Sequence, residues 1–542
     1  MINKLNGAMP RGLNPTPGET YRRGRITRLP RKSLLARILA LMFAATVHTQ
    51  IAYADERQDL ETLRNTTLNL IKMLVQQGVL KQETADQLIK DAEKTAAATA
   101  KDAPNVVRVP YVPESVKREI REQIKQEVLA QAKGERWGDP GVLPDWISRI
   151  SWEGDLRLRF QKDFYQPTNP PPIFFNSQGV NISNTQDDRQ RLRLRARLGM
   201  KANISDSISA GFGITTGSFV DPVSTNQTMG NYQNRYTIAL DRAYLKADPY
   251  NWLSVSAGRI PNPFFSTDLI WDQDLNFDGV AATFKPKFGD QWESFFTAGL
   301  FPLQEIETTQ INAAKDKWLA GAQAGVQWRS LNDSKLKLGV ALYDYRNVHG
   351  QPNPTLFSTI YNATVPQFRQ KGNSLFNIDN DGDPTTALFA LAPKFREFAV
   401  TASYDWAKFD PLHVVLNAEY VRNIGYDREE ILQRTGRDIE PQTKAYQAQL
   451  TIGHPFIKKS GEWQIFSAYK YLERDAVLDA FTDSDFHLGG TDAKGYIFGA
   501  NYGIAKNTWL SFRWLSADEI AGPPNGLPLS IDVLQLDLNA RF

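Results

Sequence analysis

The feature that most constrains the fold is a period-two alternation of apolar and polar residues that begins near residue 151 and continues to the chain end. Such alternation places the two kinds of side chain on opposite faces of a β-strand. In one segment, the apolar residues Leu192, Leu194, Ala196, Leu198 and Met200 alternate with Arg191, Arg193, Arg195, Arg197 and Gly199. A soluble β-sandwich alternates in the same way, so this pattern predicts strands without choosing between a sandwich and a barrel.

The lengths of the connections separate these two folds. The pattern predicts 16 strands, at residues 151–161, 189–202, 207–217, 234–247, 252–260, 279–286, 292–301, 317–329, 335–346, 395–407, 412–422, 443–452, 462–472, 493–503, 508–516 and 531–542. Long connections, such as 162–188 and 347–394, alternate with short ones, such as 203–206 and 330–334. Long loops at one end and tight turns at the other are typical of outer-membrane barrels, with the turns in the periplasm. We therefore expect an all-β transmembrane barrel of about 16 antiparallel strands spanning residues 151–542.

Two further features favour the barrel. Seven tryptophans lie beside the first strand or a short connection, as a one-sided aromatic girdle at the periplasmic interface would require; they are Trp152, Trp252, Trp292, Trp328, Trp406, Trp463 and Trp509. The last strand alternates and ends on Phe542. A terminal aromatic on such a strand resembles the signal read by the barrel-assembly machinery. We expect this machinery and outer-membrane lipid as partners.

The first 150 residues follow other patterns. Residues 1–54 combine a basic stretch, an apolar run at 38–47 and a small-x-small site, Ala52-Tyr53-Ala54, which predicts a cleaved signal peptide. Residues 55–133 show helical spacing and are expected to form an α-helical periplasmic segment, followed by a linker at 134–150. This segment could be a trimerising coiled coil or a helical hairpin. The hairpin is favoured because the pattern lasts about two heptads, fewer than the three or four usually needed.

Composition argues against several other functions. The net charge of +3 comes from residues 1–54, since the remainder holds 54 Lys and Arg against 59 Asp and Glu, so nucleic acid is not an expected partner. The chain has no cysteine, phosphate-binding glycine loop, G-x-S-x-G or H-E-x-x-H motif. We expect no enzyme activity, cofactor or metal. A non-conducting structural or adhesive barrel and a barrel hydrolase remain alternatives, although 16 strands leave room for a water channel.

Several separate motifs resemble the bacterial "putative porin" family. They are Arg108-Val-Pro-Tyr-Val-Pro113, Gly154-Asp-Leu-Arg-Leu-Arg159, Asp241-Arg-Ala-Tyr-Leu245, Gly258-Arg-Ile-Pro-Asn-Pro263, and Asp483-Ser-Asp-Phe486 with Gly489-Gly-Thr-Asp492. The resemblance covers nearly all of the mature chain. It implies a Gram-negative outer-membrane porin, with a helical N-terminus in the periplasm, that lets small hydrophilic solutes diffuse passively. It names no solute, and a homotrimer is an expectation from porins at large.

Six arginines are candidates for lining the pore: Arg157, Arg159, Arg191, Arg193, Arg195 and Arg197. They alternate with apolar residues, and an arginine on the lipid face would cost about 2–4 kcal/mol near the bilayer midplane, so they should face the lumen. One interpretation, slightly favoured, is a basic ladder along the pore. The other is a structural network in which Glu153, Asp155 and Asp537 neutralise part of the charge.

Acidic residues gather in the long connections. The third one, 261–278, carries Asp268, Asp272, Asp274 and Asp278. It could fold into the barrel as a constriction loop, creating a transverse field opposite the arginines, or it could lie in solvent. Residues 379–383 and 483–492 are also acidic. Neither fits the spacing of an EF-hand, because the glycine is misplaced, so hydrophilic external loops are favoured over calcium sites.

Overall fold

The computed structural model describes residues 90, 126, 147–383, 385–522 and 528–542. The chain divides into two units, residues 1–137 and 138–542, and the fold of the second follows. The predicted signal peptide and helical segment lie outside the described residues, apart from two isolated positions, and so does most of the predicted linker. In the part of the chain that the structure describes, no helix is both long and apolar enough to cross a membrane.

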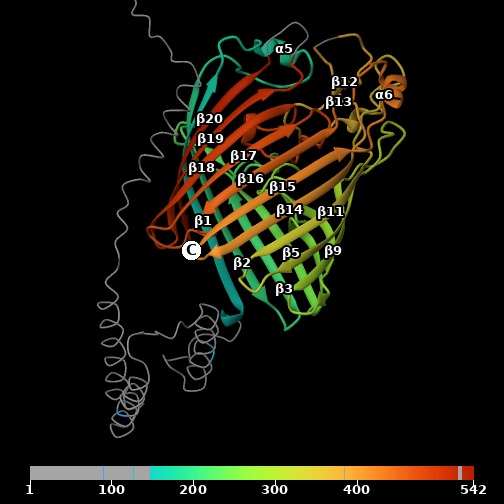
Figure 1. Cartoon of the computed structure of the whole chain (residues 1–542). Helices are drawn as coiled ribbons and strands as arrows, with labels where there is room; N and C mark the ends of the chain where they lie inside the picture. Colours follow the sequence, from blue (N-terminus) through green and yellow to red (C-terminus); the bar gives the residue numbers. More distant parts are fainter. Residues whose placement is uncertain (1–89, 91–125, 127–146, 384, 523–527) are drawn as a thin grey trace, which may run out of the picture. The chain divides into compact units, whose positions relative to one another are not determined.

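Sixteen long antiparallel strands, counted within the described residues, form a closed barrel (Figure 1). Strand β1 pairs with β2 along one edge and with β20 along the other, which closes the sheet. The predicted fold is therefore confirmed. The strands are β1 (Ile150–Tyr165), β2 (Arg189–Asn203), β3 (Ile208–Thr216), β5 (Ile238–Tyr250), β6 (Leu253–Pro261), β7 (Asn276–Phe284), β9 (Trp292–Gln304), β10 (Lys317–Arg329), β11 (Lys335–Arg346), β14 (Arg396–Phe409), β15 (Leu412–Asn423), β16 (Lys444–Gly453), β17 (Trp463–Leu472), β18 (Ala493–Ala505), β19 (Thr508–Glu519) and β20 (Ser530–Arg541).

Shorter elements occupy the connections. Strand β4 (Gln227–Thr228) pairs with β2, β8 (Lys287–Phe288) pairs with β9, and β12 (Leu375–Asn377) and β13 (Phe389–Leu391) form a separate two-stranded sheet. The helices are α5 (Pro172–Asn176) and α6 (Arg428–Thr435), with 3-10 turns η1 (Ile147–Arg149), η2 (Asn362–Thr364) and η3 (Phe486–Leu488). Both α-helices and the small sheet lie at the end of the barrel that carries the long loops (Figure 1).

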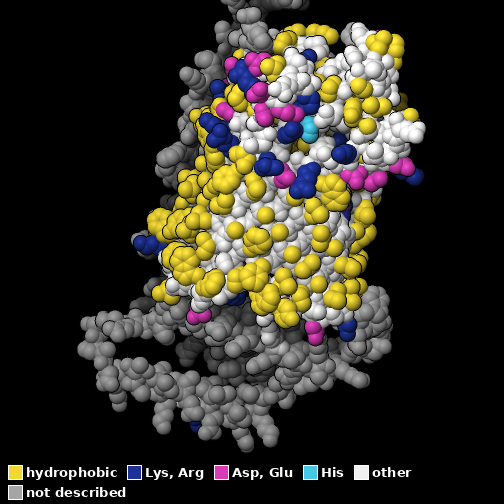
Figure 2. Space-filling view, turned by 90° about the vertical axis from the view of Figure 1, so that its right-hand side faces the viewer, with side chains coloured by type: hydrophobic (Ala, Val, Ile, Leu, Met, Phe, Trp, Pro, Cys, Tyr) yellow, Lys and Arg dark blue, Asp and Glu magenta, His cyan; other side chains and the backbone are white. Residues whose placement is uncertain are grey.

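The outer face of the wall is apolar. On β1, Leu156 and Leu158 are each 42% exposed, whereas Arg159 of the same strand is 2% exposed, so the leucines point outward and the arginine inward. In Figure 2, hydrophobic side chains cover the lower part of the wall, and charged side chains gather nearer the long loops. An apolar band below a polar rim is what a barrel needs in order to sit in lipid.

Much of the buried core lies inside the barrel. Four long loops contribute to the interior; they are named here L2 (residues 217–237), L3 (262–275), L5 (347–395) and L7 (473–492). In L3, Leu269, Ile270 and Trp271 are at most 2% exposed. The Trp271 ring centroid lies 5.0 Å from that of Phe277 on β7 and 5.1 Å from that of Tyr343 on β11. These apolar contacts hold L3 against the inner wall.

Candidate solute pathway

L3 crosses the lumen from the wall where it begins to the opposite wall. It leaves β6 and returns to β7, yet the hydroxyl of Thr267 donates to Glu419 on β15 at 2.6 Å. Asp268 accepts a hydrogen bond from Gln447 on β16 at 2.7 Å and lies 3.4 Å from the Nζ of Lys470 on β17. Strand β17 lies far around the barrel from β6 and β7 in the strand order. Three of the four predicted loop acids, Asp268, Asp272 and Asp274, therefore lie within the barrel.

The fourth predicted loop acid, Asp278, does not belong to the loop. It lies on strand β7, which begins at Asn276, three residues earlier than its predicted start. Its carboxylate pairs with Arg259 on β6, the residue directly opposite in the register, at 3.1 Å. A charged residue at a strand end looks like a loop residue when only the sequence is read.

L7 also folds into the barrel, which corrects the interpretation of residues 483–492 as a hydrophilic external loop. Asp483 pairs with Lys470 at 2.9 Å, and Asp492 pairs with Arg474 at 3.0 Å. The carboxylate of Asp485 pairs with Arg159 on β1 at 3.1 Å and with Arg513 on β19 at 3.0 Å. Lys470, Arg159 and Arg513 of the wall, together with Arg474 of L7 itself, therefore neutralise this acidic block. Among the described residues, no group of three or more His, Cys, Asp or Glu is placed to hold a metal ion.

Contacts between L3 and L7 join the two loops. The backbone N–H of Asp272 donates to the carbonyl of Phe481 at 2.8 Å, and the N–H of Ser484 donates to the Asp272 carboxylate at 2.9 Å. Burial raises the pKa of Asp272 well above its usual range, and the nearby Asp274 and Asp483 add to the shift. For Asp268, burial alone would raise the pKa, but Lys470 holds it below its usual value. The surroundings therefore favour the neutral form of Asp272 and the ionised form of Asp268.

The six predicted arginines line the inner side of β1 and β2, where most of them pair with acids. Arg157 lies directly opposite Arg195 in the register, and Arg159 directly opposite Arg193. Like charges in this position repel. Asp155 relieves the repulsion at Arg195, with an N–O distance of 2.8 Å, and Asp537 does so for Arg159, also at 2.8 Å.

The remaining arginines have polar partners as well. Arg191 pairs with Asp163 at 2.8 Å, Arg193 donates to Gln161 at 3.1 Å, and Arg157 donates to Asn226 of L2. Arg197 lies 2.7 Å from Asp155 and 3.0 Å from Asp274 of L3. Glu153, expected to neutralise the same arginines, instead lies 3.8 Å from Arg242. This arrangement supports the structural-network alternative, and the free basic ladder stays a prediction.

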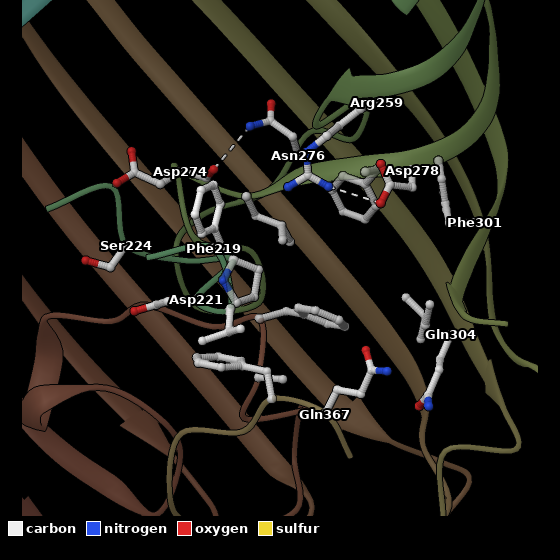
Figure 3. A pocket seen from close by; sticks show the side chains of 18 of the residues that line it. Phe219, Asp221, Ser224, Arg259, Asp274, Asn276, Asp278, Phe301, Gln304 and Gln367 are labelled. Atoms are coloured by element: carbon white, nitrogen blue, oxygen red, sulfur yellow. Dashed lines mark hydrogen bonds and ion pairs between the residues drawn. The ribbon is translucent and has the colours of Figure 1, made fainter. Parts of the chain in front are cut away.

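Between the loops and the wall lies an outer cavity of about 850 Å³. L2, L5, L7, the end of L3 and the loop-side ends of β3, β5, β6, β7, β9 and β10 line it. Figure 3 shows the ion pair of Arg259 and Asp278 at one side of the cavity, and Asp221 and Phe219 of L2 at another. The amide of Asn276 donates to the carboxylate of Asp241 at 2.8 Å. The cavity therefore has both charged and aromatic walls.

A second, inner cavity of about 350 Å³ lies along L3 and is also lined by Arg197 of β2 and Arg242 of β5. Asp241, Asp274, Leu275 and Asn276 line both cavities, so the two meet at the end of L3. Sequence reasoning assigned no role to Asp241 or Arg259, although both belong to motifs of the family resemblance. Gly258, beside Arg259, has φ +115°, and a Cβ there would lie 2.4 Å from the carbonyl oxygen of Ala243, so glycine is required.

Phe542, the predicted assembly signal, closes the barrel at its last residue. Its N–H and carbonyl exchange hydrogen bonds of 3.0 Å with Gly154 on β1. The phenyl ring covers Gly154, where a Cβ would lie 2.3 Å from Cζ of the ring, and 70% of Phe542 is exposed. Recognition by the assembly machinery stays a prediction.

A family model described as "Putative porin" matches residues 64–542. The chain belongs to this porin family. It is an outer-membrane channel, which accounts for the closed barrel and its apolar outer band. None of the curated proteins compared matches this porin.

Solved structures resemble this porin at low identity. The outer membrane channel DcaP of Acinetobacter baumannii is 11% identical with a TM-score of 0.38, over 72% of this chain and 97% of that one. OprB of Pseudomonas putida is 12% identical with a TM-score of 0.43, over 73% and 95%. An anion-selective porin from Comamonas acidovorans is 12% identical with a TM-score of 0.39, over 72% and 99%.

Proposed function

We propose that this porin lets small hydrophilic solutes diffuse passively through the outer cavity, past the end of L3, into the inner cavity. The observation that carries the proposal is the crossing of the lumen by L3, which is bonded to β2 on one side and to β15, β16 and β17 on the other. A loop held at both walls narrows the water-filled space and fixes where it is narrowest. L3 then acts as the constriction, with Asp274 facing Arg197.

Other expectations extend this proposal. The polar path through the lumen supports diffusion rather than a catalytic or purely adhesive role. Homotrimer formation, action of the barrel-assembly machinery and a periplasmic position for residues 55–133 are expectations from the sequence. The proposed solute path does not depend on them.

A single introduced cysteine tests the path, because the chain has none of its own. Asn276 lines both cavities, so Asn276→Cys places a thiol where they meet. A bulky methanethiosulfonate reagent should lower the single-channel conductance of this variant in planar bilayers. Asn380→Cys, in the exposed part of L5, is the matched control and should react without a change in current. Complete labelling of Asn276→Cys, verified by mass, with unchanged conductance would place the path elsewhere.

A further inference from the structure

The outer cavity carries more negative than positive side chains. Its lining includes Asp221, Asp241, Asp274, Asp278 and Asp479, against Arg259 and Lys317. Both cations already have partners: Arg259 pairs with Asp278 at 3.1 Å, and the Nζ of Lys317 donates to the carbonyls of Thr364 and Val365 at 3.2 and 2.9 Å. Three of the carboxylates are paired as well, Asp241 with Arg242, Asp274 with Arg197 and Asp278 with Arg259. Among the described residues, Asp221 and Asp479 are the cavity acids without an ion pair.

One of these carboxylates has an oxygen without a hydrogen-bond partner. Asp479 of L7 is 2% exposed, and within the described residues its Oδ1 accepts no hydrogen bond. The Asp479 backbone is held in place, since its N–H donates to Asn373 at 2.8 Å. Arg369 attracts the carboxylate, but the Nη1 of Arg369 also has no hydrogen-bond partner among these residues. A buried carboxylate oxygen without a donor is costly, so a donor or cation supplied by a ligand would stabilise it.

A second carboxylate approaches from a different loop. Asp221 of L2 is half-buried, and its carboxylate accepts a hydrogen bond from the N–H of Val223 at 3.1 Å. In Figure 3, Asp221 lies on the wall of the cavity beside Phe219. Phe219 is 75% exposed, so its ring is open to a ligand, and Phe368 and Phe481 also line the cavity. Aromatic faces attract organic cations, and carboxylates reinforce that attraction.

The size and charge of the cavity indicate one class of ligand. A volume of about 850 Å³ is within the range of about 300–1,000 Å³ typical of small-molecule sites. We propose that the outer cavity binds an organic cation with an aromatic or other apolar group, held by Asp221, Asp479 and Phe219. This inference rests on the proposed function, because it names the solute class that the channel selects. The arginines of β1 and β2 do not oppose it, since aspartates already pair with most of them.

Binding of three simple probes tests the inference. The protein is purified from outer membranes in detergent, and isothermal titration calorimetry measures its affinity for benzyltrimethylammonium, tetramethylammonium and benzoate. Benzyltrimethylammonium should bind most tightly, tetramethylammonium about threefold or more weakly because it lacks the ring, and benzoate most weakly. Benzoate binding as tight as that of benzyltrimethylammonium would overturn the inference.

Matched variants assign the binding to this cavity. Asp221→Asn and Asp479→Asn should each weaken benzyltrimethylammonium binding about fivefold, the effect of one charge pair. Asp187→Asn, an exposed acid of the loop after β1, removes the same charge outside the cavity and should have no effect. Phe219→Ala should weaken the benzyl probe more than tetramethylammonium. If Asp479→Asn fails to fold, Asp221→Asn and Phe219→Ala still decide the question, and unchanged affinity in both would refute the site.

Conductance separates failure of this inference from failure of the proposed function. Potassium chloride currents through wild-type protein in planar bilayers test only the open channel, whereas calorimetry tests only the cavity. If the protein conducts potassium chloride but binds benzyltrimethylammonium no more tightly than benzoate, the proposed function stands and the inference is refuted. If the protein binds the cation but does not conduct, the proposed function is refuted and the binding site stands.

Discussion

Lys470 on β17 lies 3.4 Å from Asp268, a residue of L3 that comes from the far side of the barrel. The same ammonium lies 2.9 Å from Asp483 of L7, and its side chain is fully buried. Burying an ammonium costs several kcal/mol unless carboxylates and hydrogen bonds compensate it. Lys470 therefore connects the barrel wall to both inward-folded loops at one point.

Removing this cation should loosen both loops. Lys470→Met keeps most of the side-chain volume and leaves Asp268 and Asp483 buried without their partner, which should lower the stability by about 3–5 kcal/mol. We expect a larger single-channel conductance with more current noise, because L3 is less firmly held. Lys494→Met, at an exposed position of β18, is the control for loss of charge. A variant with the wild-type conductance and melting temperature would show that Lys470 does not hold L3.

The two interpretations of the arginines predict different energetics. If Arg195 and Asp155 form a structural pair, Arg195→Gln and Asp155→Asn should each destabilise the barrel. The double variant should then lose less stability than the sum, with a coupling of about 0.5–3 kcal/mol. Arg195→Gln should also shift the reversal potential in a salt gradient toward cations, since it uncovers Asp155 and Asp274. Additive effects on stability would instead favour a basic ladder facing open water.

Cation binding should depend on pH through Asp479. Burial raises the pKa of Asp479 to about 7, although Arg369 and Lys371 of L5 counteract the shift and Asp475 of L7 adds to it. The carboxylate is neutral below this pH and charged above it, so benzyltrimethylammonium should bind more tightly at pH 8 than at pH 6. Calorimetry at both values, with Asp479→Asn as the control, checks this. The prediction fails if the variant keeps the same pH dependence as the wild type.

Barrel closure offers a test at the end of the chain. Gly154→Val places a branched side chain where even a Cβ would lie 2.9 Å from the carbonyl oxygen of Arg197 on β2 and would also displace the Phe542 ring, so it should hinder pairing of β1 with its neighbours. Phe542→Ala should lower the amount of protein inserted in the outer membrane, whereas Phe542→Tyr keeps an aromatic ring and should not. Heat-modifiable migration on gels measures the folded fraction. Normal insertion of Phe542→Ala would show that the ring is not part of the assembly signal.

The strands were predictable because their signal is local. Strands β10 and β11 have the same bounds that the alternation predicts, 317–329 and 335–346. Each residue in such a strand is assigned to lipid or lumen by its own polarity and that of its neighbours, without information from elsewhere in the chain. The family resemblance likewise included Asp241 and Arg259, although nothing in the sequence showed that they line a cavity.

The contents of the barrel were less predictable because they depend on partners far apart in the sequence. The acids at 483–492 look solvated when their neighbours alone are considered, but Lys470 and Arg159 neutralise Asp483 and Asp485 in the fold. The same holds for Asp268, whose partner Gln447 is 179 residues away. A charged residue in the sequence therefore indicates an exposed side chain only when the fold brings no residue of opposite charge into contact with it.

L3 also has a mechanical consequence. Because it is bonded to β2 at Arg197 and to β17 at Lys470, it acts as a strut across the cross-section of the barrel. Lateral pressure from the bilayer tends to flatten a hollow cylinder, and a strut opposes such flattening along its own direction. The dimensions of the lumen should then vary little between membranes of different thickness or tension.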